Sequence, residues 1–152
     1  MADSDFVPAD FEPPAPPLDD RFVLEPLGPQ HNESDYAAWT SSIDHIRVTP
    51  GYPDGRWPYE MTLDENRGDL IRHADDFARR KGFTYTVLDP GSGEVIGCLY
   101  IYPSKNSPGA HVLSWVRADR AGLDVPLYRV VRDWLASSWP FSSVDYADRN
   151  DL

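Results

Sequence analysis

One predicted strand carries a histidine and a serine, residue types that take part in acid–base and acyl-transfer chemistry. The run Ala110–Val116 is apolar and partly β-branched, which predicts a strand. Side chains alternate along a strand, so one face carries His111, Leu113, Trp115 and Arg117, and the other carries Val112, Ser114 and Val116. Imidazole changes charge near neutral pH, so His111 is a candidate general base. Its place at the start of the strand, beside a Pro-Gly loop, is also typical of an exposed histidine.

Glu60 is a second candidate for the same chemistry. It follows Trp57-Pro-Tyr at the end of a stretch rich in proline and glycine, residues 49–58, which predicts a surface loop. Such loops often form the walls of sites, so Glu60 could reach a site and favour a cationic substrate. The alternative is an ordinary surface glutamate.

Other reactive residue types lack the spacing that chemistry requires. His31, His45 and His73 lie on separate predicted elements, so we expect no metal site. Cys98 is the only cysteine, which excludes an intrachain disulfide and a cysteine zinc site and favours a small buried packing residue. A Ser-His-Asp triad would need Ser114 on the strand–turn–helix elbow that presents a nucleophilic serine. The sequence around Ser114 and His111 does not predict such an elbow. The glycines at 91 and 93 form a hairpin turn, since no helix follows them.

Three consecutive strands must position these candidates. Residues 83–88 and 95–102 flank a Pro-Gly-Ser-Gly turn and predict an antiparallel hairpin, and residues 110–116 add the next strand. Helical patterns precede and follow them, which predicts an α+β domain: a mixed, mainly antiparallel sheet flanked by helices.

The remaining elements are predicted from periodicity and capping residues. A short strand covers 21–27, and a helix capped by Ser34 or Asp35 runs through Trp39 to Ile46. A capping box, Thr62 to Glu65, begins a second helix that Gly82 ends. A third helix is capped by Asp124 and stops at Trp139-Pro140, and residues 143–146 form a last strand.

Composition indicates one folded domain and limits its partners. Residues 1–20 are rich in proline and aspartate and predict a flexible lead, followed by a single domain over 21–152. The net charge of −11 argues against nucleic acid and anionic membranes and suits a cationic small molecule such as an amine. No apolar run reaches the length of a membrane span and no signal-peptide pattern is present, so we expect a cytoplasmic protein.

The order of elements resembles the GCN5-related N-acetyltransferase superfamily over residues 21–149. Phe22-Val-Leu-Glu-Pro-Leu27 resembles its first strand, and Thr86-Val-Leu-Asp-Pro-Gly-Ser-Gly-Glu-Val-Ile-Gly97 resembles its hairpin. The resemblance implies a fold in which an amine attacks the thioester of acetyl-CoA. It also implies that the cofactor lies against the fourth strand and the N-terminus of the helix that follows.

The resemblance assigns cofactor-binding roles to the fourth strand and the next loop. The backbone of Ser114, Trp115 and Val116 would bind the pantetheine arm and the oxyanion. The family's pyrophosphate loop, Gln/Arg-x-x-Gly-x-Gly/Ala, matches Arg117-Ala-Asp-Arg120-Ala121-Gly122, with Arg120 where the first glycine belongs. Free N–H groups at 120–124 would favour an enzyme, whereas an Asp124 carboxylate bonded to them would favour a binding domain.

The family continues beyond its fifth strand, whereas this chain stops there. This difference predicts either a shortened fold or a sheet that a partner chain completes, for example in a homodimer. Two functions follow from the resemblance. One is transfer of an acetyl group from acetyl-CoA to a small amine; the alternative is a non-catalytic domain of the same fold that binds a ligand or a protein.

Overall fold

One five-stranded sheet organises the chain. The computed structural model describes residues 6–52, 58, 60–105 and 109–149. The strands are β1 (Val23–Pro26), β2 (Phe83–Leu88), β3 (Val95–Pro103), β4 (Ala110–Val116) and β5 (Val144–Tyr146). The helices are α1 (Asn32–Thr40), α2 (Ile43–Arg47), α3 (Leu63–Ala78) and α4 (Asp124–Ser138), with short 3₁₀ turns at Pro29–His31 and Ala118–Leu123.

The strands lie in the order β1-β2-β3-β4-β5, and the first four pair antiparallel. β5 pairs parallel with β4 after the chain has crossed over through α4. The predicted hairpin turn is confirmed: Asp89 donates its N–H to Glu94 and its carboxylate accepts from Gly91 and Ser92. The predicted α+β class, with a mixed and mainly antiparallel sheet, is confirmed.

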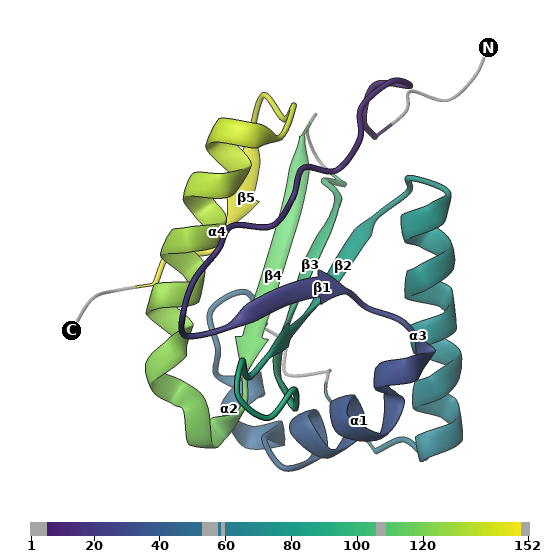
Figure 1. Cartoon of the computed structure of the whole chain (residues 1–152), viewed down its shortest axis with the longest axis vertical. Coiled ribbons are helices and arrows are strands. Elements are labelled where there is room, and N and C mark those ends of the chain that lie inside the picture. Colours follow the sequence, from purple (N-terminus) through teal and green to yellow (C-terminus); the bar gives the residue numbers. More distant parts are fainter. Residues whose placement is uncertain (1–5, 53–57, 59, 106–108, 150–152) are drawn as a thin grey trace.

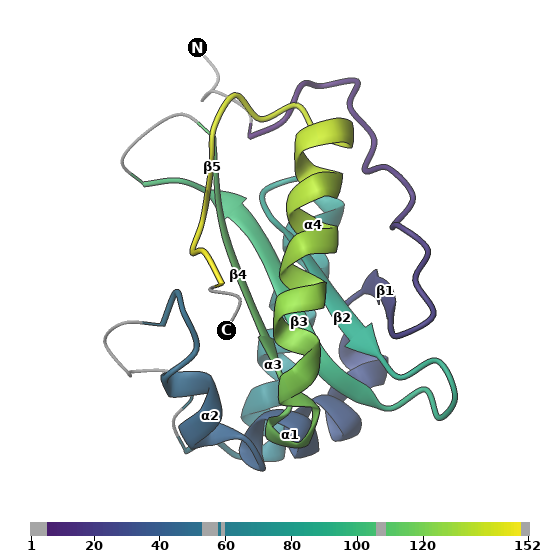
Figure 2. The same cartoon turned by 90° about the vertical axis from the view of Figure 1, so that its left-hand side faces the viewer.

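Helices cover both faces of the sheet (Figures 1 and 2). α4 packs on one face, where Val112 and Val116 of β4 join its core. α1, α2 and α3 lie on the other face, whose core includes Trp39 and Trp115. The predicted alternation along β4 is therefore confirmed, and Ser114 faces the α4 side.

The first predicted helix is two helices in the structure. α1 begins at Asn32, before the predicted caps, because a 3₁₀ turn leads directly into it and His31 Nδ1 accepts the N–H of Gly28. Ser34 does not cap α1; its hydroxyl accepts the N–H of Val95. Ser42 leaves the helical conformation (φ −132°, ψ 20°), and its hydroxyl accepts the N–H of Ala118, so a tertiary contact interrupts the helix.

The capping box of α3 is confirmed, since Thr62 and Glu65 exchange backbone-to-side-chain hydrogen bonds of 2.8 and 3.0 Å. The predicted stop at Gly82 is wrong. The helix ends at Ala78, and Arg80 adopts the left-handed conformation (φ 65°) that closes it. Gly82 has a packing role instead, because a Cβ there would lie 2.1 Å from the ring of Tyr102.

We predict that Gly82→Ala lowers the free energy of unfolding by about 1–3 kcal/mol, as overpacking does. The added methyl would push the Tyr102 ring away from His73 and Asp76, to which its hydroxyl is bonded. Urea unfolding in wild-type and Tyr102→Ala backgrounds measures this cost. An equal cost in both backgrounds would show that Tyr102 is not the cause.

The N-terminal segment packs more than its composition suggested. Val7 is buried, Phe6 stacks on Phe83 and Phe141, and Phe11 lies against Trp139. The segment passes beside α4 on its way to β1 (Figures 1 and 2). The side chains of Phe6, Val7 and Phe11 thus extend the core on that face. The average composition of the segment did not indicate this packing. The flexibility of residues 1–20 stays a prediction.

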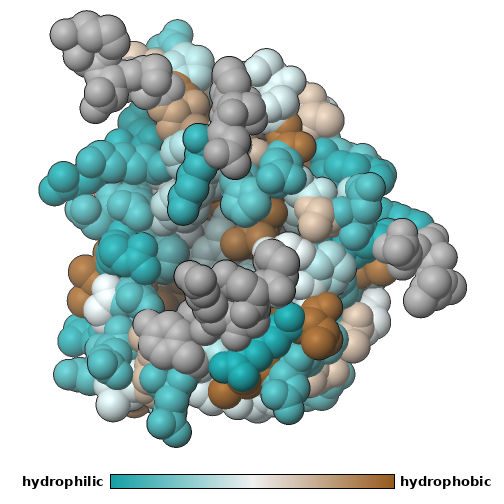
Figure 3. All heavy atoms as spheres, turned by 180° about the vertical axis from the view of Figure 1, so that it is seen from behind, coloured by the Kyte–Doolittle hydropathy of each residue, from teal (hydrophilic) through white to brown (hydrophobic). Residues whose placement is uncertain are grey.

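One face of the molecule is predominantly polar (Figure 3). Seen from behind, hydrophilic side chains cover most of the coloured face, and apolar residues form separate small areas (Figure 3). Among the described residues, none of the helices has both the length and the apolar character that a membrane crossing requires.

Candidate functional site

The backbone feature that could bind an extended ligand is the point where β4 and β5 separate. Their parallel pairing covers three residue pairs, from Ala110 with Val144 to Val112 with Tyr146. β5 thus lies beside only the first half of β4 (Figure 2). On its other edge β4 stays paired with β3 as far as Val116. We call the space between Leu113–Val116 and the chain after Tyr146 the wedge.

Polar side chains fill the wedge on its α4 side. Arg149 Nη2 donates to the carbonyl oxygen of Ser114 at 2.9 Å, so this carbonyl is directed away from β3. Ser114 Oγ and the Tyr146 hydroxyl are hydrogen-bonded at 2.6 Å. The Tyr128 hydroxyl donates to Asp148 at 2.6 Å. We call this set the wedge cluster: Ser114, Asp124, Tyr128, Tyr146, Asp148 and Arg149.

Asp124 is a member of this cluster and not a helix cap. Its carboxylate accepts from Arg149 Nε at 2.9 Å, and α4 has no side-chain cap. The predicted capping role is therefore wrong. The guanidinium of Arg149, which is 2% exposed, holds the carboxylate instead, because a buried charge requires a partner of opposite charge.

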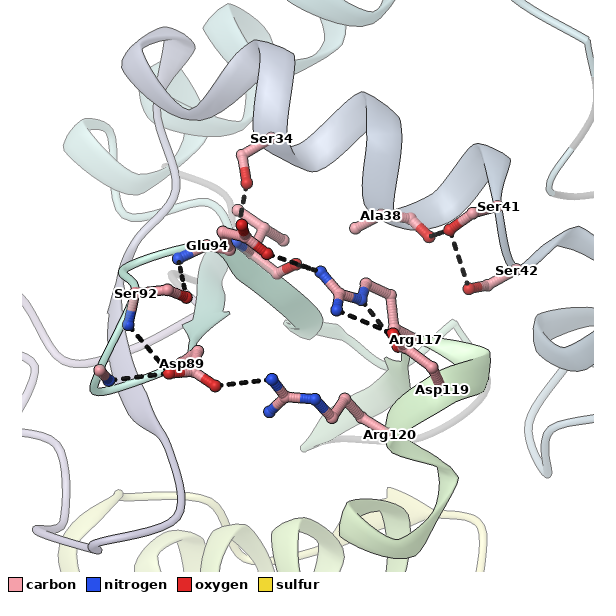
Figure 4. A network of polar contacts seen from close by, with 12 residues as sticks. Ser34, Ala38, Ser41, Ser42, Asp89, Ser92, Glu94, Arg117, Asp119 and Arg120 are labelled. Atoms are coloured by element: carbon pink, nitrogen blue, oxygen red, sulfur yellow. Dashed lines mark hydrogen bonds and ion pairs between the residues drawn. The ribbon is translucent and has the colours of Figure 1, made fainter.

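The predicted pyrophosphate loop forms the 3₁₀ turn Ala118–Leu123, and carboxylates hold both of its arginines (Figure 4). Arg117 pairs with Asp119 at 2.9 Å and with Glu94 at 3.3 Å. Arg120 pairs with Asp89 at 2.7 Å. Asp89 belongs to the β2–β3 turn, where backbone N–H groups and Arg120 lower its pKa to about 2. The two arginines thus link the loop to the hairpin.

The sequence predicted either free N–H groups in this loop or N–H groups bonded to the Asp124 carboxylate. The N–H groups of Arg120 and Asp124 show neither arrangement. Arg120 has φ −123° and ψ 29°, so it lacks a conformation reserved for glycine. Its N–H bonds to the Arg117 carbonyl, and the N–H of Asp124 bonds to Ala121. The carboxylate of Asp124 points to Arg149 and not into the loop. Ala121 and Gly122 lie within the turn, and a Cβ at Gly122 would meet no atom within 4 Å.

The two acid–base candidates lie apart from the wedge cluster. His111 is 46% exposed in its side chain, and its Nδ1 lies 3.0 Å from Asp145 of β5. A rise of about 3.3 Å per residue puts its backbone roughly 10 Å from that of Ser114, and its side chain is on the opposite face. Glu60 is exposed. No described contact joins it to His111, and residues 53–57 and 59 of the predicted loop wall lie outside the described residues.

On the α1–α3 face, β3 and β4 each contribute an aromatic residue to a buried cluster. Trp115 is buried and donates from Nε1 to the hydroxyl of Tyr100 at 3.1 Å. Burial raises the pKa of Tyr100, and of nearby Tyr52, well above the usual value for tyrosine. Burial also raises the pKa of the Cys98 thiol, which is fully buried as predicted, so this thiol is not a nucleophile at neutral pH.

Sequence reasoning missed Arg149 and the inward-facing role of Tyr146. Arg149 lies in the polar run Ala147-Asp-Arg-Asn-Asp, which has no periodicity that would predict a buried side chain. The alternating pattern of Val144–Tyr146 could have placed Tyr146 on the core side of β5. Among the described residues, no group of three or more histidine, cysteine, aspartate or glutamate side chains could hold a metal ion.

Comparison with known proteins identifies the fold. No family model and no curated protein matches the sequence. Among solved structures, an acetyltransferase from Salmonella typhimurium that modifies the N-terminal serine of ribosomal protein L7/L12 superposes with a TM-score of 0.61 at 11% identity. A ribosomal-protein-S5-alanine acetyltransferase from Vibrio fischeri gives 0.58 at 13%, and the microcin C7 self-immunity acetyltransferase MccE, solved with acetyl-CoA and AMP, gives 0.58 at 11%.

These superpositions cover 76–80% of this chain, and 63% of the Vibrio fischeri chain and 66% of the other two. At such low identity the match shows the fold. The order of its elements along the chain, with α4 between β4 and β5, agrees with the resemblance stated from the sequence. The chain therefore has the acyl-CoA N-acyltransferase fold of the GCN5-related N-acetyltransferases.

Proposed function

We propose that this protein is an acyl-CoA-dependent N-acyltransferase that transfers an acetyl group from acetyl-CoA to an amine. The observation that carries the proposal is the parallel β4–β5 pair, which separates after three residue pairs. Beyond this point the Ser114 carbonyl of β4 points away from β3, toward the wedge. An extended arm with amide groups, such as pantetheine, can pair with such an edge as a strand would.

The side chains present fit the cofactor less well than the backbone does. Arg149 already bonds the Ser114 carbonyl, and carboxylates hold the arginines of the loop. In this conformation the wedge therefore does not fit acetyl-CoA. The proposal requires the wedge cluster to rearrange.

The chain's own candidates for the transfer remain those named from the sequence. Once the wedge cluster has rearranged, the backbone of Ser114–Val116 would hold the pantetheine arm and supply N–H donors for the oxyanion. His111, oriented by Asp145, is proposed as the base. Glu60 is proposed to attract a cationic acceptor. Two kinds of acceptor are proposed, a small amine and the N-terminus of a protein. Only the second corresponds to the ribosomal-protein acetyltransferases of similar fold.

A transfer assay tests this function. The protein is incubated with acetyl-CoA and, separately, with a set of polyamines and of peptides with free or blocked N-termini. We expect release of the CoA thiol together with a mass increase of one acetyl group on one class of acceptor. Blocked peptides are the control for reaction at the N-terminus. Thiol release that is equal with and without acceptor would be hydrolysis and would contradict the proposal.

A second candidate function is a non-catalytic binding domain of the same fold. The specific observation in its favour is the filled wedge, together with the ion-paired loop.

A homodimer and a cytoplasmic location also stay proposals. Sedimentation that shows a single monomeric species at high concentration would exclude the homodimer.

A further inference from the structure

Arg149 occupies the edge of β4 that the proposed function needs. Its Nη2 bonds both the carbonyl oxygen of Ser114, at 2.9 Å, and the hydroxyl, at 3.3 Å. The side chain is 2% exposed, so the guanidinium is within the protein and not on its surface. It bonds the Ser114 carbonyl, which a backbone N–H would bond if β5 continued its pairing with β4.

The guanidinium is held from several sides. Asp124, at the start of α4, accepts from Nε at 2.9 Å, and the carbonyl of Ala147 accepts from Nη1 at 2.8 Å. The guanidinium carbon lies 5.5 Å from the ring centre of Tyr146 and 5.7 Å from that of Tyr128. These contacts join α4, β4 and the chain after β5 through a single side chain.

The ion pair between Arg149 and Asp124 makes displacement of the guanidinium costly. A neutral arm that displaced the guanidinium would leave Arg149 and Asp124 without partners in a poorly hydrated place, which is costly. The side chain of Asp124 is 18% exposed, so it can turn to water once Arg149 has left it.

We propose that Arg149 is a displaceable latch on the wedge. In the resting protein its side chain covers the Ser114 carbonyl, and acyl-CoA binds β4 only after the guanidinium has left Asp124 and the Ser114 carbonyl for solvent. This inference rests on the proposed function, because it concerns access to the same site. The apparent dissociation constant then equals the intrinsic constant divided by the fraction of open molecules, so the latch weakens binding.

Calorimetric titration with CoA tests the latch. Arg149→Met removes the charge and keeps a side chain of similar length. The double variant Asp124→Asn, Arg149→Met also removes the carboxylate that would otherwise stay buried without its partner, and so protects against loss of folding. Arg132→Met is the matched control, since Arg132 also lies over the Tyr128 ring but pairs with the exposed Asp133, outside the wedge.

We expect both Arg149 variants to bind CoA at least about tenfold more tightly than wild type, and Arg132→Met to bind as wild type does. Binding by the Arg149 variants alone, with none by wild type, would support the latch equally. Unchanged or weaker binding in both Arg149 variants, with measurable binding by wild type, would overturn the latch and leave the proposed function standing. No binding by any of the four proteins would overturn both.

Discussion

Gly97→Ala is expected to destabilise the fold by about 3 kcal/mol or more, the upper part of the range for overpacking. Gly97 lies in the middle of the sheet, on β3, opposite Val87 of β2 and Val116 of β4. A Cβ there would lie 2.5 Å from the carbonyl oxygen of Trp115. This atom belongs to the backbone of β4, so it can move only if the β3–β4 ladder is distorted.

Gly68→Ala is the matched control for this prediction. Gly68 lies inside α3, and a Cβ there would meet nothing within 4 Å. Alanine at a helical position of this kind should stabilise by up to about 1 kcal/mol. Chemical unfolding of the two variants should therefore give changes of opposite sign. A Gly97→Ala protein as stable as wild type would show that β3 and β4 are not packed as described.

Two buried groups are expected to give stability opposite dependences on pH. Burial raises the pKa of Asp35 from 3.8 to about 6, and burial, with the nearby charge of Arg72, lowers that of His73 from 6.5 to about 4. Asp35 takes a proton more readily in the folded state, so its contribution rises as pH falls from 6 to 4. His73 takes one more readily in the unfolded state, so its contribution falls as pH falls from 6.5 to 4. Each shift corresponds to about 3 kcal/mol, so the two largely cancel in wild type.

Single substitutions should separate these contributions. Asp35→Asn should raise stability at pH 7.5 by about 1–3 kcal/mol and leave a protein that loses stability between pH 6.5 and 4. Asparagine can still accept the hydrogen bond that Asn66 donates to Asp35 at 3.1 Å. His73→Gln should instead become more stable as the pH falls from 6.5 to 4.

Urea unfolding at a series of pH values measures these slopes, and the double variant, Asp35→Asn with His73→Gln, is the control. Its slope between pH 6.5 and 4 should return to that of wild type. Parallel profiles for wild type and both single variants would contradict the assignment.

The sheet and the helix positions could be predicted because local patterns determine them. β-branched and aromatic runs around a Pro-Gly-Ser-Gly turn specify the hairpin, and the exchange between Thr62 and Glu65 specifies the start of α3. Boundaries failed where a distant residue decided them. Ser42 is bonded to the N–H of Ala118, and Gly82 faces the ring of Tyr102, and neither contact has a local signal.

The elements around the candidate site were predicted better than the side-chain contacts between them. The strand and the loop of the site and the two faces of β4 were located from the sequence. The contents of the wedge were not, because an ion pair between Asp124 and Arg149 joins residues 25 positions apart whose types are common on surfaces. The roles of His111 and Glu60 remain predictions, since acid–base chemistry depends on the position of a substrate.

The central claim is that the wedge binds acyl-CoA, and thermal unfolding with and without acetyl-CoA tests it most directly. At about a hundred times the dissociation constant, a one-site ligand stabilises by about 2.7 kcal/mol, which raises the Tm of a domain of this size by roughly 5–10 °C. Wild type should show this rise, and the Asp124→Asn, Arg149→Met protein should show it at a lower concentration. A cooperative transition that does not move with acetyl-CoA in either protein would contradict the claim and leave a fold used for binding something else.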